Sequence, residues 1–305
     1  MARRVCVVLN PAAAAGRALH RWNEFAPKFA QAGLATEVLT TSQPGQAVEL
    51  ARHAATSGYD GIVAAGGDGT CREVGQGLLE AGSDTPFAAL PLGTGNDFAS
   101  QAGFRTVAET VAALVQGTSH RGDVIEVCTA GPAPPRIALN FAAVGFAVDL
   151  LRQTTPAVKR WFGSRLCYWA GFFRALRHHQ PPSLRIRADG VEFADRFFHV
   201  SASNLEFSGG GVMRLAPGAR ADDGRLEFCL ITAQNRSQIL RRFPHLLRGT
   251  HPRLAAARFF HGQRLSIIAD PPVPLALDGD VLGLTPATFT VLPGALTVAG
   301  AGRPS

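Results

Sequence analysis

The stretch Gly66-Gly67-Asp68-Gly69-Thr70 decides how the first half of the chain is expected to fold. An apolar run at residues 62–65 precedes it and a helix-like segment at 71–79 follows it, so the order is strand, glycine turn, helix. Glycines let the backbone approach a ligand closely, and the N–H groups at the start of a helix attract anions. The Asp68 carboxylate would repel a phosphate unless a cation lies between them. The stretch therefore predicts a nucleotide phosphate site that works with Mg²⁺.

A structural interpretation of the same residues is also open. Thr70 and Glu73 have the spacing of a capping box, in which a hydroxyl at the start of a helix and an acidic side chain three residues later bond each other's backbone N–H. A capped helix also makes a better anion site, so the two interpretations are compatible.

Strand-like and helix-like segments alternate from the N-terminus to about residue 116. Strands are expected at residues 5–9, 36–39, 62–65 and 87–91, and helices at 17–32, 46–55, 71–79 and 106–116. The alternation predicts a parallel sheet with helices on both faces, and ligands bind beyond the carboxyl ends of the strands in such sheets. Because Asn10, Thr41, Gly66 and Gly93 all lie at predicted strand ends, we expect their loops to converge on one edge.

From about Asp123 the pattern changes to closely spaced strands separated by turn residues. Strands are expected at residues 124–127, 137–144, 184–188, 197–201, 226–231, 264–268, 273–277 and 287–291, with helices near 164–178 and 237–248. This density predicts an antiparallel β-sandwich. The fold class is thus α/β plus β, with a nucleotide-binding domain at residues 1–122 and a β-rich domain at 123–305 whose last strand could return to the first.

The composition narrows the class of protein. With 46% hydrophobic and 17% charged residues, the chain of 305 residues is typical of a soluble globular protein. The five scattered cysteines form no CxxC pair, which favours reduced thiols and a cytoplasmic protein, and the histidines lack the spacing of zinc ligands. No apolar run reaches the length of a transmembrane segment, and the N-terminus does not read as a signal peptide. The net charge of +7 fits anionic lipid or a phosphorylated ligand better than nucleic acid, because no nucleic-acid-binding motif is present.

A second glycine turn, Gly93-Thr94-Gly95-Asn96-Asp97-Phe98-Ala99, follows the first. With both motifs, the chain resembles the diacylglycerol kinase catalytic-domain family, which includes bacterial lipid kinases and sphingosine kinases. Further shared features are Asn10-Pro11, Thr41, Asn140-Phe141, Gly145-Phe146, Asp222-Asp223-Gly224 and Leu277-Asp278-Gly279-Asp280. The resemblance implies a nucleotide-binding domain, a β-rich lipid-binding domain, and transfer of the γ-phosphate of ATP to a lipid hydroxyl.

The resemblance also implies which residues form the site. The positions that match ATP contacts are Asn10, Pro11, Ala12, Ala13, Ala14, Thr41, Gly66, Gly67, Asp68, Gly69, Thr70, Cys71, Arg72, Thr94 and Asn96. Asp280 stands where the family has the acid of its DGE motif, the general base, and Asp278 and Asp68 are the other catalytic candidates. A structural Mg²⁺ site of bacterial members matches Arg220, Asp223 and the backbone of Arg225.

Several of these residues have alternative roles. Asp68 can hold the catalytic Mg²⁺ directly or through water, and Asp97 could bind the metal or cap the following helix. Thr94 and Asn96 could likewise contact phosphate or ribose, or cap that helix. Taken alone, Asp278-Gly279 would indicate a hairpin turn, although the nucleotide motifs favour a catalytic role for the motif.

The chain departs from the family pattern at two motifs. The first loop usually reads NPxSG, but here it is Asn10-Pro11-Ala12-Ala13-Ala14-Ala15-Gly16, so a hydroxyl is missing and binding through backbone N–H groups is what remains. The DGE motif is DGD, so Asp280 has a shorter reach than Glu. In addition, Arg220 replaces the family's usual lysine, where we expect a backbone carbonyl to be the metal ligand.

Residues 158–179 and 241–248 combine arginines with aromatic or apolar side chains, as helices at membrane interfaces do, although each could equally be an amphipathic helix that covers the β-rich domain. The sequence as a whole predicts a lipid kinase, cytoplasmic and peripheral to the membrane, that acts on a diacylglycerol-like, phosphatidylglycerol-like or sphingoid alcohol. A homodimer is left open. The alternatives are an NAD kinase-like enzyme, since NAD kinases also use GGDGT, and a catalytically inactive nucleotide- or lipid-binding protein.

Overall fold

The computed structural model describes residues 2–153 and 171–301. The chain divides into two compact units. The α/β unit comprises Met1–Asp123 and Gly294–Ser305, and the β unit comprises Val124–Pro293. The last strand, β15 (Ala287–Ala299), contributes to both, because its beginning pairs with β12 and its end pairs with β4.

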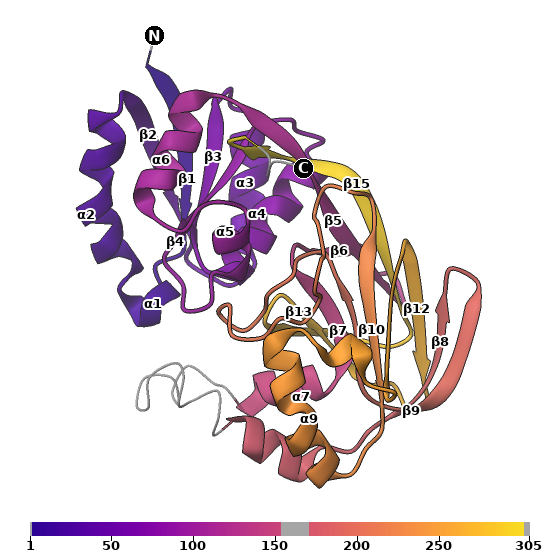
Figure 1. The fold of residues 1–305 in the computed structure, drawn as a ribbon. Coiled ribbons are helices and arrows are strands. Elements are labelled where there is room, and N and C mark those ends of the chain that lie inside the picture. Colours follow the sequence, from indigo (N-terminus) through magenta and orange to yellow (C-terminus); the bar gives the residue numbers. More distant parts are fainter. Residues whose placement is uncertain (1, 154–170, 302–305) are drawn as a thin grey trace. The chain divides into compact units, whose positions relative to one another are not determined.

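The α/β unit is built on a parallel sheet, as the sequence predicts (Figure 1). The strand order is β2 (Leu34–Thr40), β1 (Arg3–Leu9), β3 (Gly61–Gly66), β4 (Phe87–Pro91) and the end of β15. The central strands β1, β3 and β4 are short apolar runs whose side chains are buried on both faces, which is the pattern that helices on both sides of a parallel sheet require.

The helices of this unit pack against one another as well as against the sheet. They are α1 (Ala13–Gly16), α2 (Ala18–Gln31), α3 (Gln46–Ala55), α4 (Asp68–Glu80), α5 (Asp97–Gln101) and α6 (Val107–Gln116). Helix α2 contacts α6, whereas α3 packs against α4. The contact between α3 and α4 is close enough that it needs a glycine at Gly77. A Cβ added there would lie 2.3 Å from the carbonyl oxygen of Val48.

The order of the strands locates the crevice at which a sheet of this type commonly binds ligands. The chain leaves β1 for β2 on one side and leaves β3 for β4 on the other, while β1 and β3 are neighbours. A doubly wound sheet binds ligands where successive connections diverge, just beyond the carboxyl ends of the strands. Here that point lies after Leu9 and Gly66.

The β unit is antiparallel, again as predicted. Its main path runs β14 (Asp280–Leu284), β13 (Pro274–Leu277), β7 (Phe141–Gly145), β9 (Val191–Ser203), β8 (Ser183–Ala188), β12 (Arg264–Ala269) and β15. β10 (Leu226–Thr232) joins β9 to β11 (Ala257–Gly262), and β5 (Ser119–Thr129) pairs with β6 (Arg136–Ala138). Phe197, Phe228 and Phe289 are among the fully buried side chains of its core.

Helices cover one part of the β unit. They are α7 (Phe146–Gln153), the helical residues 171–178, α9 (Arg236–Arg248) and the short η1 (His251–Arg253). Phe146, Phe172, Phe198 and Ile239 form a second buried cluster there, against which Phe243 packs. Among the described residues, no helix is long and apolar enough to cross a bilayer.

Several elements of the β unit differ from the sequence prediction. The single strand expected at 137–144 is two strands, because the consecutive N–H groups of Leu139, Asn140 and Phe141 all donate to one carboxylate and cannot alternate as strand N–H groups do. Helix α7 and strands β11 and β14 were not predicted. Most of the helix expected near 164–178 lies outside the described residues.

Candidate active site

Asn10 joins the first loop to the glycine turn. Its backbone N–H donates to the carbonyl of Ala65 at 3.0 Å, which continues the pairing of β1 with β3. Its side-chain Nδ2 donates to Oγ1 of Thr70 at 3.1 Å, and Oδ1 accepts the N–H of Ala12 at 3.0 Å. One asparagine thus fixes the start of the alanine loop relative to the start of α4.

The two glycine turns touch through their backbones. The carbonyl of Gly66 accepts the N–H groups of Leu92 and Gly93, both at 2.9 Å. A Cβ on Gly93 would lie 2.4 Å from the Cα of Gly67, and a Cβ on Gly66 would lie 2.3 Å from Oγ1 of Thr70. No residue with a side chain fits at Gly66 or Gly93 without displacing its neighbour.

Asp68 connects the same two turns. It is the first residue of α4 and is half-buried, and its Oδ1 accepts the backbone N–H of Phe98 at 2.9 Å. Phe98 is the second residue of α5, so a carboxylate from the loop after β3 satisfies an N–H at the start of the helix after β4. An acidic side chain is also favoured there by the partial positive charge of a helix start.

The predicted capping box of Thr70 and Glu73 is wrong. Helix α4 has Gly67 as its N-cap residue, and no side chain caps it. Thr70 lies inside the helix with its hydroxyl bonded to Asn10, and Glu73 accepts the N–H of Gly45 at 3.3 Å. The helix begins earlier than the sequence indicated because Asp68 and Gly69 are part of it.

Asn96 closes the second turn on itself. Its φ is +57°, and its Oδ1 accepts the N–H of Gly93 at 2.9 Å while its Nδ2 donates to the carbonyl of Gly93 at 3.0 Å. These two bonds attach the Asn96 side chain to the backbone of its own loop. Thr94 is exposed at the tip of the turn, whereas Asp97 is buried at the first position of α5.

The other residues that were predicted to contact the nucleotide would do so mainly through backbone atoms. In the alanine loop, φ is +54° at Ala14, +57° at Ala15 and +86° at Gly16, a run of left-handed residues that is unusual for alanine. Thr41 is buried and donates its N–H to the carbonyl of Leu9 at 2.9 Å. Two further predicted contacts, Cys71 and Arg72, are buried within α4. Pro11 and Ala13 are half-buried and Ala12 is exposed.

The donor set at this edge fits Mg²⁺ that arrives with a phosphate ligand. Carboxylate oxygens of Asp68 and Asp97 are the ligands that Mg²⁺ prefers. In residues 2–153 and 171–301, no group of three or more His, Cys, Asp and Glu side chains is arranged to hold a metal. Mg²⁺ commonly takes one or two carboxylates and completes its shell with phosphate oxygens and water. The residues therefore fit a metal shared with a triphosphate and not a metal held by protein side chains alone.

In the β unit, Asp278 and Gly279 form the two-residue turn of the β13–β14 hairpin, with φ of +48° and +100°. Asp278 is buried, and its carboxylate accepts the N–H groups of Leu139 at 2.6 Å, Asn140 at 2.8 Å and Phe141 at 3.0 Å. Asp280 is the exposed first residue of β14. The geometry thus makes Asp278 a positioning residue for the hairpin and leaves Asp280 at the surface.

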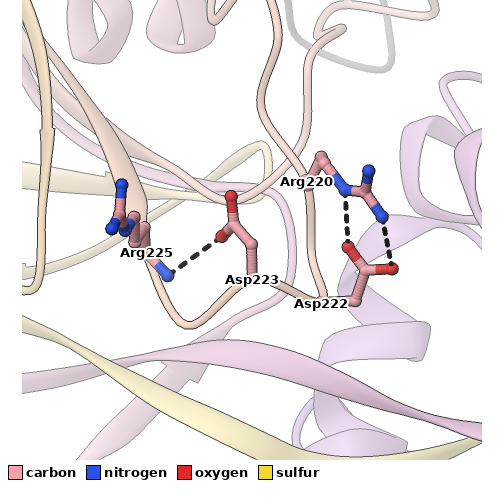
Figure 2. Close-up of polar contacts among 4 residues, drawn as sticks. All are labelled: Arg220, Asp222, Asp223 and Arg225. Carbon is pink, nitrogen blue, oxygen red and sulfur yellow. Dashed lines mark hydrogen bonds and ion pairs between the residues drawn. The ribbon is translucent and has the colours of Figure 1, made fainter. Parts of the chain in front are cut away.

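The expected structural metal site in the β unit has few suitable ligands (Figure 2). The Arg220 guanidinium donates to both carboxylate oxygens of Asp222, at 3.0 and 3.2 Å, and this contact raises the pKa of Arg220. Asp223 uses Oδ1 to accept the N–H of Arg225 at 3.0 Å. Arginine side chains cannot bind a cation, and the Asp222 carboxylate is paired with Arg220. The side chains alone therefore do not fit a divalent cation, and backbone carbonyls would have to supply the remaining ligands.

Two features involve residues that were not among the predicted ATP or metal contacts. Gly93 was not among the predicted ATP contacts, although its place in a glycine turn after a strand is a usable signal. In the β unit, a cavity of about 50 Å³ lies beneath α9, lined by Ile239, Phe243, Leu246 and His251 among others. No local motif marks this cavity because its lining comes from β9, β10, α9 and the segment after it.

Comparison with known proteins agrees with this description along nearly the whole chain. Residues 4–127 match the diacylglycerol kinase catalytic domain, and residues 142–300 match the YegS C-terminal NAD kinase beta sandwich-like domain. The diacylglycerol kinase of Bacillus subtilis (strain 168) is 27% identical over 296 residues, which is 95% of this chain and 94% of that protein. A probable lipid kinase YegS-like protein of Pseudomonas aeruginosa is 31% identical over 269 residues, 88% of this chain and 85% of its own.

A solved structure of a diacylglycerol kinase from Bacillus anthracis str. Sterne shares the fold. The TM-score is 0.73 at 21% sequence identity, and the match covers 98% of this chain and 97% of that one. Together with the glycine turns and the β unit described above, these similarities establish the family. The chain belongs to the family of proteins that carry the diacylglycerol kinase catalytic domain, which includes the YegS-like lipid kinases.

Proposed function

We propose that the protein transfers the γ-phosphate of ATP, with Mg²⁺, to the hydroxyl group of a lipid alcohol. The observation that carries this proposal is the backbone contact between the two glycine turns at Gly67 and Gly93. It brings the amide-rich starts of α4 and α5 together just beyond β3 and β4, beside the crevice that follows β1 and β3. Such a surface suits a chain of phosphates.

The chemistry needed on the nucleotide side is positioning and charge neutralisation. Backbone N–H groups of Gly67 and Gly69 would bind phosphate oxygens, and the alanine loop would contribute through its backbone because its side chains cannot hydrogen-bond. When bound, Mg²⁺ supplies positive charge against the phosphates. Asp68 and Asp97 would hold it, and the bond from Phe98 keeps the Asp68 side chain oriented.

On the acceptor side, Asp280 would accept the proton of the lipid hydroxyl. It lies on a hairpin whose turn is fixed by the three backbone N–H groups bound to Asp278, so its backbone is well defined while its side chain is exposed. A positioned base of this kind commonly contributes about 10²- to 10⁴-fold to the rate. The acceptor class would be a diacylglycerol-like, phosphatidylglycerol-like or sphingoid alcohol, and the protein would work in the cytoplasm at a membrane surface.

A soluble acceptor is the second candidate, because the C-terminal domain matches a model described as NAD kinase-like. The test is to incubate the purified protein with ATP and Mg²⁺ against a panel of lipid alcohols in mixed micelles, and separately against NAD. Mass spectrometry then identifies any phosphorylated product. We expect a phosphorylated lipid and no NADP, and loss of the product with Asp280→Asn. NADP without lipid phosphate would overturn the lipid assignment, and ATP binding without any product would favour an inactive binding protein.

A further inference from the structure

Helix α9 has two faces of different character. Ile239 is buried, and Phe243 and Leu246 pack on the helical clusters of the β unit, so these side chains anchor the helix. A second face, beside the buried one, consists of residues four apart, Arg236, Leu240, Pro244 and Arg248, together with Arg241, and all of them are exposed. Leu240 is 43% exposed, although it is a large apolar side chain in the middle of this face.

The helical residues 171–178 extend the same surface. Their buried face packs on α9 through Phe172 and Phe243, whose ring centroids are 4.1 Å apart. At the surface, the Arg236 guanidinium donates to the carbonyl of Arg177 at 2.5 Å. The exposed side chains of this segment repeat the pattern of α9, with Phe173 53% exposed beside further basic residues. The outer surface, as we define it, comprises Phe173, Arg174, Arg177, Arg236, Leu240, Arg241 and Arg248.

The outer surface carries uncompensated positive charge. Residues 171–188 and 228–269 contain no Asp or Glu, so no acidic neighbour in sequence is present on either segment. In the part of the chain that the structure describes, none of the five arginines of the outer surface forms an ion pair with a carboxylate. Elsewhere arginines are paired, as Arg214 is with Glu206 and Arg220 with Asp222.

We infer that the outer surface docks the protein on an anionic lipid bilayer. Arginines spaced around exposed Leu240 and Phe173 match both layers of such a surface, because the guanidinium groups meet phosphate headgroups while the apolar side chains reach the acyl boundary. The inference deepens the proposed function and rests on it for its purpose, since a kinase with a bilayer-resident acceptor must reach the membrane surface. The binding itself can be measured without catalysis.

The apolar members favour a bilayer over nucleic acid. A duplex would be met by a basic surface with polar side chains that reach phosphates and base edges, and exposed Leu240 and Phe173 would gain nothing there. A bilayer surface binds both the basic and the apolar side chains favourably. Its attraction for each arginine depends on anionic lipid and weakens with salt.

The test measures binding to vesicles in the absence of ATP. The vesicles are phosphatidylcholine alone, phosphatidylcholine with phosphatidylglycerol, and phosphatidylcholine with phosphatidylserine, and duplex DNA serves as the competing polyanion. We expect binding to both anionic vesicles and none to phosphatidylcholine alone. The triple variant Arg174→Ala, Arg241→Ala and Arg248→Ala should weaken vesicle binding about a hundredfold, at about fivefold for each arginine. None of these three side chains makes a hydrogen bond or ion pair in the described structure, so the fold should persist.

The matched control removes the same number of charges from another surface of the same unit. Arg185, Arg187 and Arg264 are exposed on β8 and β12, and their triple change to alanine should weaken vesicle binding by less than about fivefold. Leu240→Ser, which changes no charge, should also weaken binding. The inference would be overturned if the two triple variants lost vesicle binding equally, if binding did not depend on anionic lipid, or if the protein preferred DNA to vesicles. Vesicle binding that persists in a protein without kinase activity would refute the proposed function and leave the docking surface standing.

Discussion

The Oδ1 atom of Asp68 accepts the backbone N–H of Phe98 at 2.9 Å, so an acidic side chain of one glycine turn holds the helix that follows the other. The carbonyl of Gly66 adds two backbone bonds between the same turns. Because both turns end strands of one parallel sheet, their relative position is set by strand pairing as well as by these bonds. The arrangement gives Asp68 a structural role besides the metal role proposed for it.

Gly93→Ala should separate the two turns. Its new Cβ would meet the Cα of Gly67 at 2.4 Å, so backbone must move, and we expect a loss of about 1–3 kcal/mol in the free energy of unfolding. Because the turns form the proposed phosphate site, ATP affinity should fall at least about tenfold, which is 1.4 kcal/mol. Urea unfolding and calorimetric titration with ATP measure the two effects.

Gly77→Ala is the control for that prediction. Its Cβ would lie 2.3 Å from the carbonyl of Val48, in the contact between α3 and α4, so the variant should be destabilised to a similar extent. Its ATP affinity should stay close to that of the unmodified protein at a temperature well below both unfolding midpoints. Unchanged ATP affinity in Gly93→Ala would rule out the second turn as part of the phosphate site.

Substitutions of the two aspartates of the DGD motif should have different effects on stability and activity. Asp278→Ala leaves three buried N–H groups without their acceptor, and at about 1–3 kcal/mol for each unsatisfied group the loss of stability should be about 3 kcal/mol or more. Asp280→Asn changes an exposed side chain, so stability should shift by less than about 0.5 kcal/mol. Its kcat should nevertheless fall by about 10²-fold or more.

Urea unfolding and initial rates on the same preparations distinguish the two roles. A folded and fully active Asp280→Asn would remove the proposed base. A stable Asp278→Ala that loses only activity would show that Asp278 itself takes part in the chemistry and does not merely position the hairpin.

Two buried histidines should make stability depend on pH. Burial lowers the pKa of His199 to about 3, with the neighbouring His251 and His179 adding to the effect, and burial lowers the pKa of His251 to about 4. The unfolded chain takes up these protons below about pH 6.5 and the folded chain does not, so the free energy of unfolding decreases as the pH falls from about 6.5 toward the folded pKa values. Between pH 7 and pH 5 the loss should be about 2 kcal/mol per histidine.

Urea unfolding over that pH range measures this slope. The double variant His199→Asn and His251→Asn should show a shallower dependence, whatever its absolute stability. An identical slope in the variant would mean that other groups cause the acid sensitivity.

Much of the α/β unit could be predicted from local sequence. Helix α3 and strand β4 have the predicted bounds, because apolar periodicity and glycine turns are local signals. The β unit was predicted less completely. Strand β14 begins at Asp280, and its place depends on the Asp278 carboxylate binding backbone from residues 139–141, a contact between segments far apart in the chain.

In the candidate site, too, local features could be predicted from the sequence and contacts between distant segments could not. The glycine turns were evident from residue type and spacing, but the roles of their side chains were not. Nothing in the sequence shows that Asn96 bonds Gly93 in both directions or that Asp68 reaches Phe98. Thr70 and Glu73 matched a capping box by spacing, and the competing partners Asn10 and Gly45 come from other loops.

The most direct measurement is the rate of phosphate transfer from ATP to lipid by Asp68→Asn. Asparagine keeps a carbonyl oxygen that can accept the N–H of Phe98, so the free energy of unfolding should change by only about 1 kcal/mol. It removes the negative charge that the proposed Mg²⁺ needs, so the rate should fall about a hundredfold or more at saturating lipid. A well-folded Asp68→Asn with the rate of the unmodified protein would contradict the account, because the Asp68 carboxylate would then serve only to hold the two turns together.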